Sequence, residues 1–174
     1  MWIFGYGSLM WHPGFRFVER HRAVLSGQQR AFCVRTVHHR GTPGLPGLVM
    51  GLKPDGVCVG IAYLVESALA EQVADYLRER ELDHYPVYRE AHVDILLDDA
   101  GAVSATTYLP RKDHPDFLPD LTLHEQLAII RRARGISGTN PDYVRSAAGS
   151  LRDMDIDEPT IFAVEKALDE KPAP

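Results

Sequence analysis

Two glutamates near the middle of the chain are the residues best suited to proton transfer. Glu79 and Glu81 fall at the end of residues 68–81, whose apolar side chains recur at helical spacing. On a helical wheel with Leu69 at zero, the apolar face centres near about 40°, Glu81 lies at about 120° and Glu79 at about 280°. Glu81 is therefore expected at the rim of the buried face, and Glu79 on the solvent side.

This difference in environment decides which glutamate could act as a base. Partial desolvation raises the pKa of a carboxyl group toward the range in which a general base works, whereas a solvated carboxyl keeps its ordinary pKa. The spacing thus favours Glu81. The alternative is that residues 78–81 form a solvated charge run at a fraying helix end, without a chemical role.

The motif Tyr6-Gly7-Ser8-Leu9 follows an apolar, strand-like run at the N-terminus. Gly5 and Gly7 permit backbone conformations that a Cβ atom would forbid, so consecutive N–H groups can face a ligand oxygen at the strand end. We expect an anion or an oxyanion to bind there. The alternative is an ordinary junction between a strand and a turn, because short glycine motifs are weak evidence.

Two more residues have the chemistry to bind a carboxylate. Arg40 is the one cation in a turn-rich loop, residues 38–47, that contains three glycines and two prolines. Tyr143 falls in the first turn of a predicted helix and could donate a hydrogen bond to a ligand. The alternatives are a solvated connection for the loop and a plain core position for the tyrosine.

Five segments, in order, resemble the ChaC-type gamma-glutamylcyclotransferases. They are residues 6–9, 38–43, 46–52, 76–81 and 135–144, and the likeness extends over residues 1–155. The resemblance implies an α+β fold in which a small mixed β-barrel is flanked by helices and the C-terminal third is helical. It also implies an enzyme that cleaves glutathione to 5-oxoproline and cysteinylglycine.

The resemblance also implies a set of site residues. The family's catalytic glutamate follows an arginine, which Arg80-Glu81 matches, although Arg78-Glu79 is the same pair two positions earlier. The implied substrate-binding residues are Tyr6, Gly7, Ser8, Leu9, Arg40 and Tyr143. A tyrosine that the family places after the glutamate corresponds to either Tyr85 or Tyr88, and the sequence leaves this choice open.

This reaction needs few protein groups. The γ-glutamyl group brings its own nucleophile, the α-amine, and its own electrophile, the γ-amide carbonyl, so that lactam closure is intramolecular. Glu81 would take the ammonium proton and later protonate the departing nitrogen. Backbone N–H groups of residues 7–9 would hold either the oxyanion or the substrate α-carboxylate.

Other chemistries lack their residue patterns. The eight histidines, His84 among them, show no paired ligand spacing, and Ser8 does not lie in a G-x-S-x-G elbow. The Gly5-Tyr6-Gly7 run lacks the third glycine of a dinucleotide-binding site. We therefore expect no metal and no cofactor. With 19 basic and 24 acidic residues and no basic run, nucleic acid is not expected as a partner.

Short strands followed by helices must position these residues. We predict strands near residues 1–6, 16–25, 29–37, 48–53 and 57–65, with Asp55-Gly56 as a hairpin turn between the last two. Ser67 should cap the helix over 68–81. A second hairpin is predicted from 87–97 and 103–109. This order predicts an α+β domain rather than a repeating βαβ arrangement.

The C-terminal third carries three helix signals. Thr122 and Glu125 form a capping box, and Gly135 is expected to end that helix. Asn140 and Pro141 are expected to open the next helix as its N-cap and first residue. Pro159 is expected to open the last one.

The 174 residues fit one domain, predicted over 1–170, with a frayed tail at 171–174. Cys33 and Cys58 lie in apolar stretches and are expected to be reduced, and the start of the chain lacks the features of a signal peptide. No apolar run approaches the ~20 residues that span a bilayer. We therefore expect a cytoplasmic protein without a membrane partner. Its oligomeric state is left open.

Two other functions stay open. One is cyclotransfer from other γ-glutamyl amides or amines, because the sequence gives few indications of what holds the leaving half. The other is a non-catalytic regulatory or binding module. Such a module would need the turn at residues 7–9 but would not need a carboxylate at the rim of the buried face of the helix.

Overall fold

The computed structural model describes residues 1–83 and 85–170, and the chain forms two compact units. The first unit comprises Met1–Gln29 and Leu52–Lys112, and the second comprises Arg30–Gly51 and Asp113–Pro174. The tail predicted at 171–174 and the side chain of His84 lie outside the described residues.

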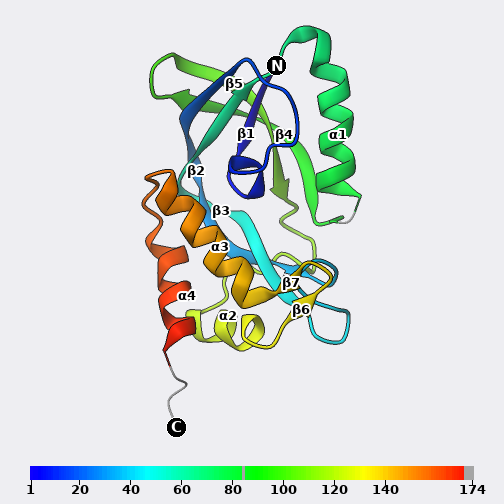
Figure 1. Ribbon diagram of the computed structural model, residues 1–174, viewed down its shortest axis with the longest axis vertical. Helices are drawn as coiled ribbons and strands as arrows, with labels where there is room; N and C mark the ends of the chain where they lie inside the picture. Colours follow the sequence, from blue (N-terminus) through cyan, green and yellow to red (C-terminus); the bar gives the residue numbers. More distant parts are fainter. Residues whose placement is uncertain (84, 171–174) are drawn as a thin grey trace. The chain divides into compact units, whose positions relative to one another are not determined.

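A closed five-stranded barrel dominates the first unit, with the strand order β1-β3-β2-β4-β5 (Figure 1). β1 (Trp2–Gly5) pairs antiparallel with β3 (Gly47–Leu64) and parallel with β5 (Gly101–Pro110). β2 (Glu19–Thr36) and β5 each pair antiparallel with β4 (Tyr88–Leu97). The parallel pair of β1 and β5 beside antiparallel pairs makes the barrel mixed, which confirms the expected fold.

The barrel is closed around apolar side chains that alternate inward along its strands. The cluster includes Phe4 of β1, Leu25 of β2 and Ile95 of β4, all almost fully buried. The hairpin of β4 and β5 confirms the prediction, and Gly101 at its turn has φ +80, a left-handed conformation that favours glycine. Packing of this core therefore stabilises the barrel, and the barrel holds the ends of β1 and β5 in position.

β2 and β3 differ from the prediction, because each is one strand of 18 residues rather than two short ones. Asp55 does adopt a left-handed φ of +68, as a hairpin turn requires, but it does so within β3. Gly56 has another role. A Cβ atom there would lie 2.7 Å from the Cβ of Gln29, so glycine permits the close approach of β2. The predicted hairpin at Asp55-Gly56 is therefore wrong.

The helix that carries the two glutamates is α1 (Ala70–Leu82), which packs on β4 (Figure 1). Val73 and Leu77 form its buried face, as the helical wheel predicts. Ser67 does not cap it. Ser67 instead begins a short 3-10 turn, η2 (Ser67–Leu69), and Leu69 stands at the N-cap of α1.

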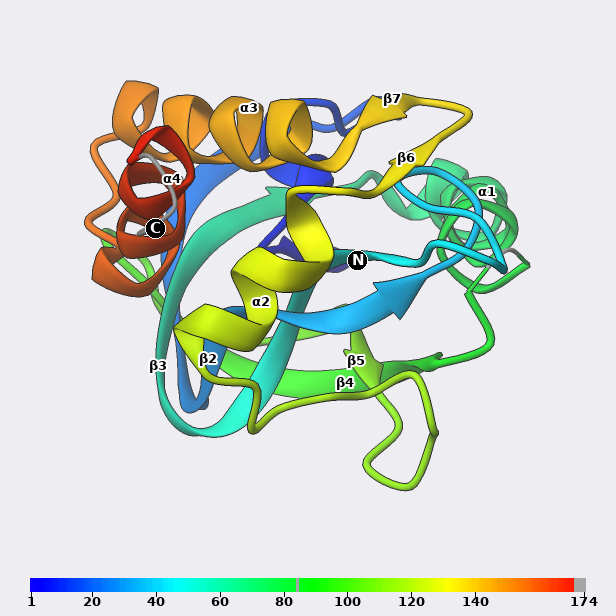
Figure 2. The same cartoon turned by 90° about the horizontal axis from the view of Figure 1, so that it is seen from below.

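The second unit contains α2 (Leu123–Ile130), α3 (Asn140–Asp153) and α4 (Pro159–Asp169), and α4 packs on both other helices (Figure 2). A small hairpin of β6 (Arg134–Gly135) and β7 (Gly138–Thr139) precedes α3. Within this unit the buried Arg30 forms an ion pair with Glu158, just before α4. No helix among the described residues is both long and apolar enough to cross a membrane.

The helix signals of this unit are confirmed in part. The capping box of Thr122 and Glu125 is formed, and Pro159 opens α4. α2 ends at Ile130, however, and Gly135 lies in β6, where it packs against backbone atoms of residues 38 and 39. The N-cap of α3 is Thr139 rather than Asn140. The Asn140 side chain is buried instead, and it pairs with both backbone groups of Leu48.

Candidate active site

Glu81 lies in the last turn of α1 with a side chain that is only 21% exposed. Glu79 of the same helix is exposed, as the wheel predicts. Burial raises the pKa of the Glu81 carboxyl, and the neighbouring Arg80 guanidinium lowers it by a smaller amount. Glu81 therefore binds a proton more readily than a solvated glutamate does, as a general base that deprotonates an ammonium group should.

Arg80 connects Glu81 to the segment that follows β1. Its Nε lies 3.2 Å from Oε1 of Glu81, and its Nη2 donates to Oγ of Ser8 at 3.0 Å. Its Nη1 donates to the carbonyl oxygens of His12 at 2.7 Å and Pro13 at 3.0 Å. One guanidinium thus brings the predicted base together with the predicted Tyr6–Leu9 motif.

The side chains of this N-terminal motif have separate roles. The Tyr6 hydroxyl donates to the carbonyl oxygen of Tyr108 at 2.7 Å, which ties the end of β1 to β5. Leu9 is buried, and its carbonyl accepts from the Tyr63 hydroxyl at 3.0 Å. Ser8 is exposed and begins a 3-10 turn, η1 (Ser8–Met10). The Ser8 side chain lies beside the Arg80–Glu81 pair, because its Oγ accepts from Arg80.

The two glycines of the motif do not adopt left-handed conformations. Gly7 has φ −125 and ψ −135, and Gly5 is not among the residues with positive φ. Gly5 instead permits a close approach, because a Cβ atom there would lie 2.9 Å from the Cβ of Leu9. The first N–H groups of a 3-10 turn have no partner within that turn, so those of η1 are directed away from it.

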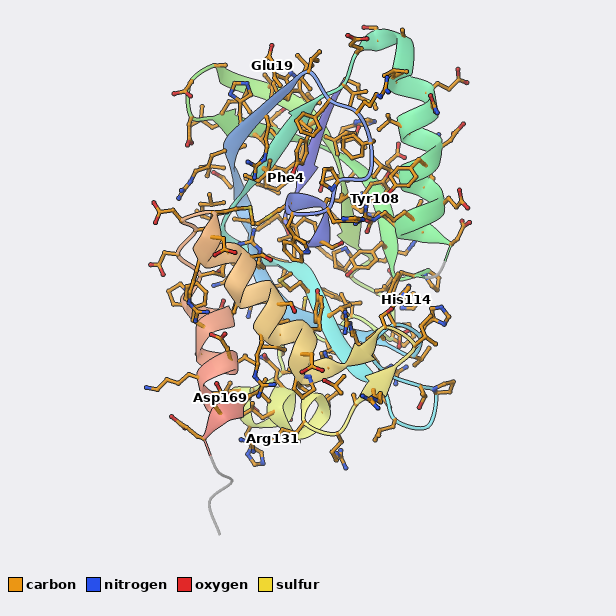
Figure 3. The ribbon with its side chains drawn as sticks, viewed as in Figure 1. Phe4, Glu19, Tyr108, His114, Arg131 and Asp169 are labelled. Atoms are coloured by element: carbon orange, nitrogen blue, oxygen red, sulfur yellow. The ribbon has the colours of Figure 1, made fainter. Side chains whose placement is uncertain are left out.

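Tyr108 of β5 is a further candidate that the sequence analysis did not identify (Figure 3). The residue is 3% exposed, and its hydroxyl is the buried side-chain polar atom without a hydrogen-bond partner in the described part of the chain. Burial raises its pKa well above the ordinary value, and the charges of Glu90 and Glu81 raise it further. A buried hydroxyl without a partner costs about 1–3 kcal/mol. Such a group is suited to bind a ligand.

Arg40 and Tyr143 belong to the second unit, where the structure brings them together. The Arg40 guanidinium carbon lies 5.3 Å from the centre of the Tyr143 ring, and its Nη1 donates to the carbonyl of Thr139 at 3.3 Å. The Tyr143 hydroxyl accepts from the N–H of Met50 at 3.2 Å. Both side chains thus have structural contacts in addition to their predicted role in binding.

The loop at 38–47 is fixed by neighbouring backbone. The N–H groups of Ile136 and Ser137 donate to the carbonyls of His38 and His39, at 3.1 and 3.0 Å. Within the loop, Thr42 and Leu45 exchange backbone hydrogen bonds. The hairpin of β6 and β7 therefore holds the position of the loop that carries Arg40.

Tyr85 and Tyr88 are in contact, with ring centres 5.9 Å apart. Tyr88 begins β4 and is buried, whereas Tyr85 is half-buried. Both stay candidates for the tyrosine that follows the glutamate. Within 1–83 and 85–170, no three His, Cys, Asp or Glu side chains are grouped so that they could hold a metal ion.

The sequence contains signals for the contacts of Arg80 and for Tyr108, neither of which was predicted as part of the site. Arg80 falls at about 20° on the helical wheel, close to the centre of the apolar face, and a cation there must find polar partners. Tyr108 is the one tyrosine in a strand of small and apolar residues. The acceptors for Arg80 in residues 8, 12 and 13 are remote in sequence, so the pattern alone did not identify them.

Comparison with known proteins places the chain in a family. A family model described as "ChaC-like protein" matches residues 1–171. The chain is 36% identical over 151 residues to the glutathione-specific gamma-glutamylcyclotransferase of Escherichia coli. The matched region covers 87% of this chain and 65% of that protein. This chain thus spans slightly less than two thirds of the length of that relative.

Two other relatives are covered more fully. The glutathione-specific gamma-glutamylcyclotransferase of Schizosaccharomyces pombe is 31% identical, over 95% of this chain and 89% of that protein. Glutathione-specific gamma-glutamylcyclotransferase 1 of Danio rerio is 32% identical, over 97% of this chain and 88% of that protein. A crystal structure of a yeast gamma-glutamyl cyclotransferase specific to glutathione shares the fold, with a TM-score of 0.85, 23% identity and coverage of 97% and 95%. The chain therefore belongs to the ChaC-like protein family.

Proposed function

We propose that this protein cleaves glutathione by intramolecular cyclotransfer, releasing 5-oxoproline and cysteinylglycine, with Glu81 as the general base and acid. The names of the relatives from E. coli, S. pombe and D. rerio support this substrate. The observation that carries the proposal is Glu81 itself. It is a mostly buried carboxylate with a raised pKa, held beside one guanidinium.

The reaction needs a base because the substrate's α-amine is protonated near neutral pH. Glu81 takes a proton from the ammonium group, and the free amine attacks the γ-carbonyl carbon. A carbon–nitrogen bond forms, and the carbonyl oxygen becomes an oxyanion. The bond to the cysteine nitrogen then breaks. The attacking nitrogen loses two protons and the departing nitrogen gains two, so that Glu81 is ionised again at the end of the cycle.

Other groups would stabilise the substrate and the oxyanion. The N–H groups of Gly7, Ser8 and Leu9 are proposed to hold either the oxyanion or the α-carboxylate. The Tyr108 hydroxyl, which has no hydrogen-bond partner in the described part of the chain, is proposed to donate to a substrate oxygen. Tyr6, Arg40 and Tyr143 stay predicted substrate contacts. An increased KM in variants of these three residues would support that role.

The direct test is incubation of the purified protein with glutathione, γ-glutamyl dipeptides and γ-glutamylamines, followed by quantification of 5-oxoproline by mass spectrometry. We expect 5-oxoproline and cysteinylglycine in equal amounts from glutathione. Product from the γ-glutamyl dipeptides or γ-glutamylamines alone would show that the substrate is another class of γ-glutamyl compound. No product from any of them would favour a non-catalytic binding module.

A further inference from the structure

The guanidinium of Arg80 has more partners than a surface arginine requires. Its side chain is 20% exposed, and its Nη1 donates to the Tyr76 hydroxyl at 3.0 Å in addition to the carbonyls of His12 and Pro13. Its Nη2 donates to Ser8. An arginine presents five N–H donors in a rigid plane, so fixing both Nη atoms also fixes the direction of Nε.

The segment that supplies these acceptors is itself held against α1. Gly14 has φ +78, and a Cβ atom there would lie 2.1 Å from the Tyr76 hydroxyl. Only glycine fits at this approach without displacing Tyr76, which is also an acceptor for Arg80. The backbone of residues 12–14 and the side chain of Tyr76 therefore hold the guanidinium between them.

The consequence for Glu81 is an unusual contact. Consecutive residues of a helix do not face each other. Nevertheless, Nε of Arg80 reaches to 3.2 Å from Oε1 of Glu81, because the rest of the guanidinium is held in place. Arg78 of the same helix differs, since it is about half exposed and pairs with Asp75 and Glu90 instead.

We propose that Arg80 is a positioning residue, whose guanidinium holds the Glu81 carboxylate and residues 8–13 in one fixed arrangement. This inference rests on the proposed function for its meaning in catalysis, but the arrangement itself can be tested without activity. The charge that acts directly on Glu81 is that of Arg80, on its own helix. Glu81 in turn acts on Tyr108 of β5, as do Glu90 of β4 and Arg78 of α1.

The decisive experiment measures the titration of Glu81 by NMR in protein with carbon-13-labelled glutamate, with the signal assigned from Glu81→Gln. Arg80→Gln removes the positive charge, so the Glu81 titration should move to higher pH. Arg78→Gln is the matched control on the same helix and should move it much less. An Arg80→Gln titration that coincides with the wild-type curve would overturn the proposal, whether or not the protein makes 5-oxoproline.

Arg80→Lys separates geometry from charge and serves if Arg80→Gln does not fold. Lysine keeps the charge but loses the planar fork, so the Glu81 titration should stay near that of the wild type. Turnover should still fall on the order of 10²-fold, as expected for a misplaced catalytic group. Full turnover in Arg80→Lys would show that charge alone is needed and would overturn the positioning role. Absence of turnover in the wild type would instead reject the proposed function.

Discussion

Nε of Arg80 lies 3.2 Å from Oε1 of Glu81, its neighbour in the chain, at the end of a helix whose other face is buried on the barrel. Burial disfavours the ionised Glu81 carboxylate, and the guanidinium opposes this effect. The balance leaves the pKa of Glu81 above its ordinary value, while the contact fixes the direction of the carboxylate.

The pH dependence of stability should reveal the cost of ionised Glu81. Because its folded pKa is raised, Glu81 favours folding below its unfolded pKa, and this contribution is lost as the pH rises through the folded value. Glu81→Gln should therefore raise the melting temperature relative to the wild type more at pH 8 than at pH 4. Glu79→Gln should show no such difference. A Glu81→Gln protein that is less stable at pH 8 would contradict this account.

Tyr108→Phe should separate activity from stability. The variant removes a buried hydroxyl that has no hydrogen-bond partner among residues 1–83 and 85–170, so the melting temperature should stay the same or rise. If the hydroxyl binds substrate, turnover should fall on the order of tenfold, the effect of one hydrogen bond. Tyr63→Phe is the contrasting variant. Its hydroxyl donates to the carbonyls of Leu9 and Met10, so its loss should lower the melting temperature.

Gly7→Ala tests where the glutamyl group binds. Gly7 has φ −125, so alanine should cause no left-handed strain. A methyl group beside the first N–H groups of η1 should instead obstruct the ligand, and turnover should fall. We would measure melting temperature and specific activity on the same preparation, with 5-oxoproline as a product inhibitor. Wild-type turnover in a variant that only melts earlier would return this glycine to a structural role.

Metal removal should have no effect, because the substrate carries its own nucleophile and Glu81 supplies the base. Turnover after exhaustive EDTA treatment should equal that of untreated protein. A loss that zinc or manganese restores would contradict the mechanism.

Local sequence signals predicted much of the fold. The β4–β5 hairpin and the capping box of α2 depend on a few adjacent residues, and both are confirmed. The lengths of β2 and β3 depend on long-range pairing, which also decides that Asp55 lies within a strand rather than in a turn. A left-handed residue between two apolar runs is ambiguous until its cross-strand neighbours are known.

The candidate site likewise has features that local sequence predicts and features that depend on long-range contacts. The exposure of Glu79 and the burial of Glu81 follow from helical periodicity, so the wheel predicts both. Besides its local partners Tyr76 and Glu81, Arg80 has acceptors 67, 68 and 72 positions away in the chain, and no local pattern contains those three. The burial of the Tyr108 hydroxyl depends on closure of the barrel, which only the fold can show.

The most direct test compares Glu81→Gln with Glu79→Gln in the formation of 5-oxoproline from glutathione. Both variants replace a carboxylate with an amide of similar shape on the same helix, so they differ in environment rather than in chemistry. Glu81→Gln should stay folded and lose on the order of 10²- to 10⁴-fold in turnover, as expected for a general base. Glu79→Gln should keep wild-type turnover. Equal losses in the two variants, or a loss in Glu79→Gln alone, would contradict the assignment of Glu81 as the base.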